Sequence, residues 1–199
     1  MKRAKTPVAT SPAMAKGSVV LGTYAYLLAS HGATELQAVR DRLPAQVAAD
    51  LDAADATDEA PYALLVALWE AIDQRIGEDA PRWAEAAGAY SIESGGVQLY
   101  GGILRKATPQ AFLTQSISLF RLYYHPGDIT VVEDAPGRAI LRLVDFDPIT
   151  RLFCRRLTGG LRRAVELAGG ESARVRHVRC SIEGDAFCEW QLEWHVPRG

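Results

Sequence analysis

The sequence has few cysteines, no long apolar run and none of the common catalytic motifs. Its 199 residues include three cysteines, an odd number that is typical of a reducing cytoplasm rather than of a disulfide scaffold. No run of about 18 apolar residues occurs, so no membrane span is predicted. Walker, G-x-S-x-G, H-E-x-x-H and G-x-G-x-x-G patterns are all absent. We therefore expect a cytoplasmic protein that is not an enzyme.

The composition is that of an ordinary globular protein, but its charge is unevenly distributed. The net charge is −2, which gives no global polycation for nucleic acid or anionic lipid. The segment 35–93 carries 13 acidic and four basic residues, whereas 138–179 carries ten arginines and four acids. Faces of opposite sign would help the two halves, or two subunits, to dock. The alternative is an anion or nucleic-acid surface on the arginine-rich part.

The N-terminus is interpreted as a tail that precedes one domain. Residues 1–17 carry Lys, Arg, Thr, Pro, Ser and Ala without periodicity, so we predict a flexible tail over 1–17 and a single domain over 18–199. An apolar stretch follows and could pass for the core of a signal peptide. The tail is long, however, and Gly22, Thr23 and two tyrosines interrupt the stretch, so export is the less favoured alternative.

The pattern of apolar residues changes from a helical period to a strand period after His125. Helices are predicted over 19–30, 35–43, 44–52, 62–76 and 110–124, with another that begins at Pro81. Strands are predicted over 129–134, 138–145, 173–182 and 186–196, with a helix over 149–168 between the two hairpins. The expected fold class is α+β, a helical layer packed on a four-stranded antiparallel sheet in the order helices-β-β-α-β-β.

All three cysteines fall near the final hairpin. Cys180 and Cys188 lie four residues on either side of Gly184, so a tight hairpin there makes them cross-strand neighbours. Cys154 on the preceding helix and His177 complete a set suited to tetrahedral zinc. Residues 177 and 180 point to opposite faces of a regular strand, so His177 needs a bulge or a twist to join. The alternative is that the cysteines are small buried hydrophobes and His177 a surface residue.

Between Cys154 and Trp190 the sequence resembles a known family. Cys154, Gly159-Gly160-Leu161, Glu166-Leu167, Cys180, Gly184-Asp185 and Cys188-Glu-Trp190 resemble the 4-vinyl reductase domain, also found in phenol-sensing transcription activators. Its superfamily shares a fold with haem-based NO sensors and with a vesicle-tethering subunit. The resemblance implies a zinc site of three cysteines with an acidic residue where this sequence has His177. The Tyr-x-Ser-x-Arg motif of the haem-binding relatives is absent.

The resemblance also implies a sensor or adaptor domain that binds a small apolar molecule between the helices and the sheet. Four aromatic residues are candidates to line that pocket, although core packing is the usual role of aromatics at helical spacing: Tyr100, Phe120, Tyr123 and Tyr124. We expect no effector domain after Gly199, so the resemblance implies a partner protein as effector.

Two other functions stay open, a protein-interaction scaffold without ligand and an accessory protein of tetrapyrrole metabolism. We also expect a homodimer through the N-terminal helices. The reason is that the apolar surface of Trp69, Trp83 and their neighbours is larger than one face of a four-stranded sheet can cover.

Overall fold

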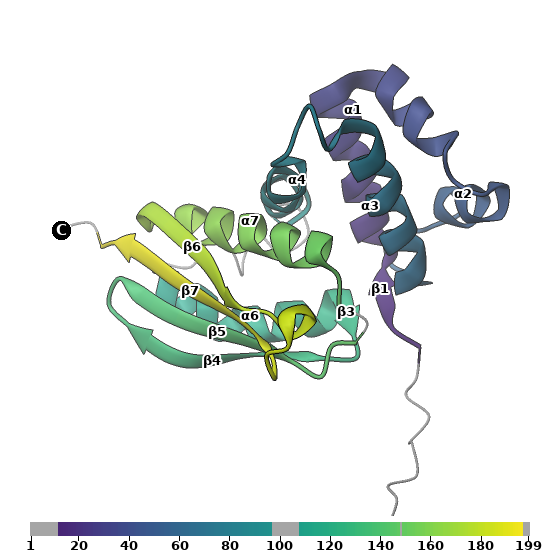
Figure 1. Cartoon of the computed structure of the whole chain (residues 1–199). Coiled ribbons are helices and arrows are strands. Elements are labelled where there is room, and N and C mark those ends of the chain that lie inside the picture. The colour runs from purple at the N-terminus through teal and green to yellow at the C-terminus, as the bar shows by residue number, and fades with distance from the viewer. Residues whose placement is uncertain (1–11, 97–107, 148, 197–199) are drawn as a thin grey trace, which may run out of the picture.

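A four-stranded antiparallel sheet and one long helix form the C-terminal half of the molecule (Figure 1). The computed structural model describes residues 12–96, 108–147 and 149–196. The strands are β4 (Asp128–Ala135), β5 (Arg138–Val144), β6 (Glu171–Arg179) and β7 (Cys188–His195), in the order β4-β5-β7-β6. Helix α7 (Arg151–Leu167) connects β5 to β6 and lies along one face of this sheet. The predicted fold class is confirmed.

Local sequence signals explain why these elements begin and end where they do. The β4–β5 hairpin turns through Pro136 and Gly137, and Gly137 has a φ of +79° that favours glycine. Thr150 caps α7, because its side chain accepts a hydrogen bond from the backbone N–H of Phe153. This helix begins at Arg151, two residues after the predicted start at 149. The strand predicted to end at 182 ends at Arg179, because a 3₁₀ turn over Ser181–Glu183 follows it.

The N-terminal half is helical, as the periodicity predicted. It contains α1 (Gly17–Arg40), α2 (Ala45–Asp52), α3 (Tyr62–Ile76), α4 (Trp83–Ser91) and a π-helical turn, η1 (Ile92–Gly96); α6 (Pro109–Tyr123) leads into the sheet. The two helices predicted over 19–30 and 35–43 form one element with a break at Gly32, whose φ is +85°. No helix in the part of the chain that the structure describes is long and apolar enough to cross a membrane.

A second, smaller sheet was not predicted. Three short strands pair antiparallel in the order β2-β1-β3: β1 (Met14–Lys16), β2 (Glu59–Pro61) and β3 (Tyr124–His125). The expected tail over 1–17 is therefore wrong for its last residues, which form β1 and the start of α1. Strands of two or three residues show no alternation, so only their tertiary pairing reveals them.

Helix α7 crosses α4 at very close range, on the side of α7 that faces away from the sheet (Figure 1). A Cβ built on Gly159 would lie 1.9 Å from the carbonyl oxygen of Glu85, and one on Gly88 would lie 1.9 Å from that of Arg156. The absence of a Cβ at Gly159 therefore allows close packing of α7 on α4.

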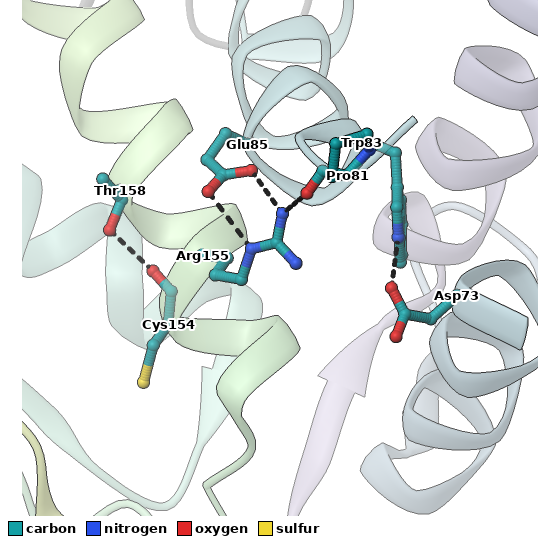
Figure 2. Close-up of polar contacts among 7 residues, drawn as sticks. All are labelled: Asp73, Pro81, Trp83, Glu85, Cys154, Arg155 and Thr158. Carbon is teal, nitrogen blue, oxygen red and sulfur yellow. Dashed lines mark hydrogen bonds and ion pairs between the residues drawn. The ribbon is translucent and has the colours of Figure 1, made fainter. Parts of the chain in front are cut away.

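Opposite charges of the two halves meet at this helix crossing. Arg155 of α7 donates to both carboxylate oxygens of Glu85 and to the carbonyl oxygen of Pro81, as Figure 2 shows. Farther along α7, Arg163 pairs with Glu93 at 2.8 Å. The docking of an acidic half on an arginine-rich half therefore occurs within one chain.

The two tryptophans that suggested a homodimer are buried within the single chain. Trp69 and Trp83 are 0% and 1% exposed, and Nε1 of Trp83 donates to a carboxylate oxygen of Asp73 at 2.7 Å (Figure 2). The premise of that prediction is wrong, because the helical half shares one hydrophobic core with the sheet half. The homodimer stays a prediction, but the two tryptophans no longer support it.

Candidate functional site

The structure brings Cys154, His177, Cys180 and Cys188 together in one cluster, here named the thiol cluster. One potential ligand atom from each residue lies within 4.8 Å of those of the other three. The Sγ atoms of Cys154 and Cys188 are 3.9 Å apart, and all three cysteines are free and buried. The structure therefore brings the cysteine of α7 next to the cysteines and the histidine of the final hairpin, as predicted.

The loop before β7 has the geometry that this assembly needs. Gly184 has a φ of +100°, and the carboxylate of Asp185 accepts the backbone N–H of Cys180 at 2.8 Å. The pairing of β6 with β7 shifts register between His177 and Arg179, which is a β-bulge. This bulge is the irregularity that His177 required, and it allows the imidazole to lie beside the thiols.

The sulfur atoms of the thiol cluster are electrostatically unequal. The Cys154 thiol and both the backbone N–H and the hydroxyl of Ser181 lie within hydrogen-bond distance of the Cys188 sulfur. These hydrogen bonds, that of Cys154 above all, hold the pKa of Cys188 below its usual range. The same contact, together with burial, raises the pKa of Cys154. Cys188 is therefore the first thiol of this pair to ionise.

A second cluster, here named the aromatic cluster, lies where the helical half meets the sheet half. It consists of six rings, each of which contacts at least two others: Tyr62, Trp69, Phe120, Tyr124, Phe146 and Phe153. The ring centroids of Phe146 and Phe153 are 4.7 Å apart, and those of Tyr62 and Phe146 are 5.1 Å apart. The Tyr62–Phe146 contact is edge-to-face, a geometry that is favourable for aromatic pairs. The cluster is drawn from α3, α6, β3, α7 and the segment after β5.

Arg156 lies against the aromatic cluster and is 5% exposed. Its guanidinium carbon is 4.9 Å from the centre of the Trp69 ring, and its Nη2 donates to the Ser91 hydroxyl at 3.3 Å. The other terminal nitrogen, Nη1, is buried without a hydrogen-bond partner among the residues that the structure describes. Burial raises the pKa of Tyr62 and Tyr124, so these neighbouring hydroxyls stay neutral beside the cation.

The predicted ligand-binding residues have different outcomes. Phe120 and Tyr124 belong to the aromatic cluster, and Tyr123 is half-buried at the end of α6. Tyr100 lies outside the described residues. Whether any of them binds a ligand remains a prediction.

The sequence interpretation missed Arg156, although a signal for it exists. Arg156 follows Phe153 by three residues and precedes Gly160 by four, so it lies on the apolar face of a strongly amphipathic helix. A cation on that face is unusual, because arginine is almost never fully buried unless it is paired.

A shallow groove of about 370 Å³ lies elsewhere on the surface, between α4, α7 and β6. Four arginines contribute to its lining: Arg82, Arg162, Arg174 and Arg176. Glu85 and Glu193 also line it, and Arg176 pairs with Glu193. Because its charges are mixed, this groove is a weaker candidate site than the aromatic cluster.

Comparison with solved structures identifies the fold. The chain is similar to the Fe(II) unliganded H-NOX protein from K. algicida, at 10% identity and a TM-score of 0.72 over 92% of this chain and 97% of that chain. It is also similar to an H-NOX protein from S. oneidensis in the Fe(II)NO ligation state, at 14% identity and a TM-score of 0.70 over 91% and 99%. No family model and no curated protein matches the sequence.

The prediction of zinc as the cofactor is wrong on this comparison. The similar structures are described by their Fe(II) iron, and one is described by porphyrin distortion and haem redox potential, at 14% identity and a TM-score of 0.67 over 92% of this chain and 97% of that chain. The zinc prediction had transferred the metal of a family that this comparison does not identify. The proximity of four side chains in the thiol cluster is weak evidence for any one ion.

No histidine of this chain is placed to hold a haem iron at the aromatic cluster. A haem iron is most often held by an axial histidine, and the sequence has four. His31 packs on Tyr26, His177 belongs to the thiol cluster, and His125 and His195 are exposed, so none faces the aromatic cluster. The chain therefore has the H-NOX fold without the histidine ligand that haem most commonly takes.

Proposed function

We propose that the protein is a non-enzymatic sensor domain of the 4-vinyl-reductase type that binds a small molecule at the aromatic cluster. The observation that carries this proposal is the position of the cluster, at the junction of the helical half and the sheet half. A ligand that displaces or spreads these rings changes how the two halves pack, which is the kind of change an effector protein can recognise. The similar structures are described as H-NOX proteins rather than as enzymes, which agrees with a non-enzymatic role.

The composition of the cluster supports a ligand with an apolar body. Phe146 and Phe153 offer apolar faces, while Tyr62 and Tyr124 add hydroxyl groups. Binding sites for small molecules are usually apolar with a few placed polar groups. The scaffold alternative would need a contiguous exposed apolar patch, and the large exposed hydrophobic residues are distributed over α1, α6, β4, β6 and the final loops.

Native mass spectrometry of the protein as purified, with thermal shifts in a panel of small aromatic compounds, tests this proposal. We expect a retained ligand or a compound that raises the melting temperature. A Phe146→Ala variant should lose the shift, whereas Val132→Ala, at an exposed residue of β4, should keep it. A chain that retains nothing and responds to no compound contradicts the proposal.

We further propose that the thiol cluster is a metal-ligand set that clips α7 to the final hairpin. Three thiols and an imidazole in mutual proximity are typical of sites for thiophilic ions, and Nε2 of His177 is buried without a hydrogen-bond partner among the described residues. Four protein ligands would make such a site structural, because they leave no position for a substrate.

Elemental analysis of protein purified without chelator or a metal-binding tag tests this second proposal. About one equivalent of a transition metal is expected, and Cys188→Ser should lose it. If His177 is an essential ligand, His177→Ala should also lose the metal; if His177 is a peripheral ligand, this variant should keep it. Three freely titrating thiols in metal-free protein would contradict the proposal.

A further inference from the structure

Helix α7 carries five arginines, and the most buried of them is the one without an acidic partner among the described residues. The four others each pair with a carboxylate: Arg151 with Glu183, Arg155 with Glu85, Arg162 with Glu166, and Arg163 with Glu93. Arg156 is 5% exposed, and no carboxylate of the described residues forms an ion pair with it. Its electrostatic neighbours are the neutral hydroxyls of Tyr26, Tyr62 and Tyr124.

A buried arginine of this kind is costly for the protein on its own. Arginine keeps its charge under all ordinary conditions, and a buried charge is tolerated when a partner compensates the loss of water. The Trp69 face and the Ser91 hydroxyl compensate one side of the guanidinium only. Nη1, which is buried and without a partner among the described residues, is a donor for which the protein provides no acceptor there.

We infer that Arg156 recognises an anionic group of the ligand, and that the ligand is a small aromatic carboxylate. The planar guanidinium matches a carboxylate by two parallel hydrogen bonds, and the adjacent rings match a flat apolar body. This inference rests on the proposed function and sharpens it, because a purely apolar molecule would leave the Arg156 charge unpaired. A carboxylate at Nη1 would complete the charge balance of the aromatic cluster.

The test compares benzoate with benzamide, a neutral molecule of nearly the same shape, by calorimetry on the full chain. The natural protein should bind benzoate about 10- to 100-fold more tightly than benzamide. Arg156→Met should remove this preference and leave benzamide affinity within about twofold, since methionine preserves an apolar side chain of similar length. The matched control is Arg151→Met, on the same helix but 70% exposed at its side chain, which should keep the preference.

A melting curve without ligand separates a binding role from a structural one. If Arg156 is present for a ligand, Arg156→Met should melt at the same temperature as the natural protein or about 2–4 °C higher, because an unpaired buried charge is removed. A marked loss of stability indicates that Arg156 is structural, and it overturns the inference.

Two binding outcomes distinguish this inference from the proposed function. Equal affinity of the natural protein for benzoate and benzamide overturns the recognition of an anion and leaves a neutral-ligand sensor standing. Binding of neither compound, in a protein that also retains no ligand, overturns the proposed function itself.

Discussion

Cys154 and Arg156 are two residues apart on α7 and belong to two different kinds of environment. The Cys154 sulfur points away from the Arg155–Glu85 pair in Figure 2 and belongs to the thiol cluster at the final hairpin. Arg156 belongs to the aromatic cluster between the helical and the sheet half. Three of the four members of the thiol cluster lie within 12 residues of one another in the sequence, between His177 and Cys188, whereas the surroundings of Arg156 come from α1, α3, α4 and β3.

A site whose residues are close together in the sequence can be predicted from spacing, whereas a site built from distant elements cannot. A hairpin with its turn at Gly184 brings Cys180 and Cys188 together by local geometry, so spacing alone indicates their proximity. A buried cation among rings from distant elements leaves only one local trace, an arginine on the apolar face of a helix.

The largest effect is expected from Gly159→Ala, which blocks the crossing of α7 and α4. The new Cβ would lie 1.9 Å from the carbonyl oxygen of Glu85, so one helix must move. We expect a loss of about 3 kcal/mol in the free energy of unfolding, measured by urea denaturation.

Gly160→Ala is the matched control for this prediction. The nearest atoms to its Cβ are 3.5 Å away, and alanine is the better helix former by about 1 kcal/mol. Gly160→Ala should therefore leave stability unchanged or raise it. Similar losses for both variants would mean that the crossing tolerates a methyl group and that the helix itself is responsible.

An intermediate effect is expected at the thiol cluster, where Cys154 and Cys188 hold different elements. Hydrogen exchange should show faster exchange in β6 and β7 for Cys188→Ser, and in α7 for Cys154→Ser. We expect each variant to lose about 2 kcal/mol, because each places a hydroxyl where a buried sulfur had its contacts. If both variants changed hydrogen exchange equally across the whole domain, the proposal that the thiol cluster holds α7 to the final hairpin would be contradicted.

The smallest effect is expected from the ion pair of Glu85 with Arg155. Burial opposes ionisation of Glu85, but its hydrogen bonds with Arg155 outweigh this and lower its pKa. A lowered pKa stabilises the folded state above the unfolded pKa of about 4.3, and this contribution is lost as pH falls through the folded pKa. After solvent screening we expect Glu85→Gln to lose about 0.5 kcal/mol at pH 7.

Unfolding at several pH values checks this sign. The stability curves of Glu85→Gln and the natural protein should converge as pH falls below the lowered pKa of folded Glu85, where the carboxyl is protonated in both states. Glu78→Gln, at an exposed residue after α3, should differ from the natural protein at pH 7 by less than Glu85→Gln does. A difference for Glu85→Gln that grows toward acid would contradict the ion-pair argument.

Most of the regular elements could be predicted from the sequence because periodicity is a local property. The stripe of α3, the strand alternation of β7 and the bulge required at His177 all follow from spacing. The short strands β1 to β3 could not be predicted, because their residues are extended only through pairing with distant segments.

The sequence by itself determined the α+β order of elements and the meeting of Cys180 with Cys188, because neighbouring residues enforce both. Only the tertiary structure decided that Gly159 serves a helix crossing with α4 and that Trp69 and Trp83 are covered within one chain. It also decided that, within the part of the chain that the structure describes, Arg156 is the α7 arginine without a carboxylate partner. These facts depend on which distant elements meet, and several pairings of amphipathic helices satisfy one pattern of apolar residues equally well.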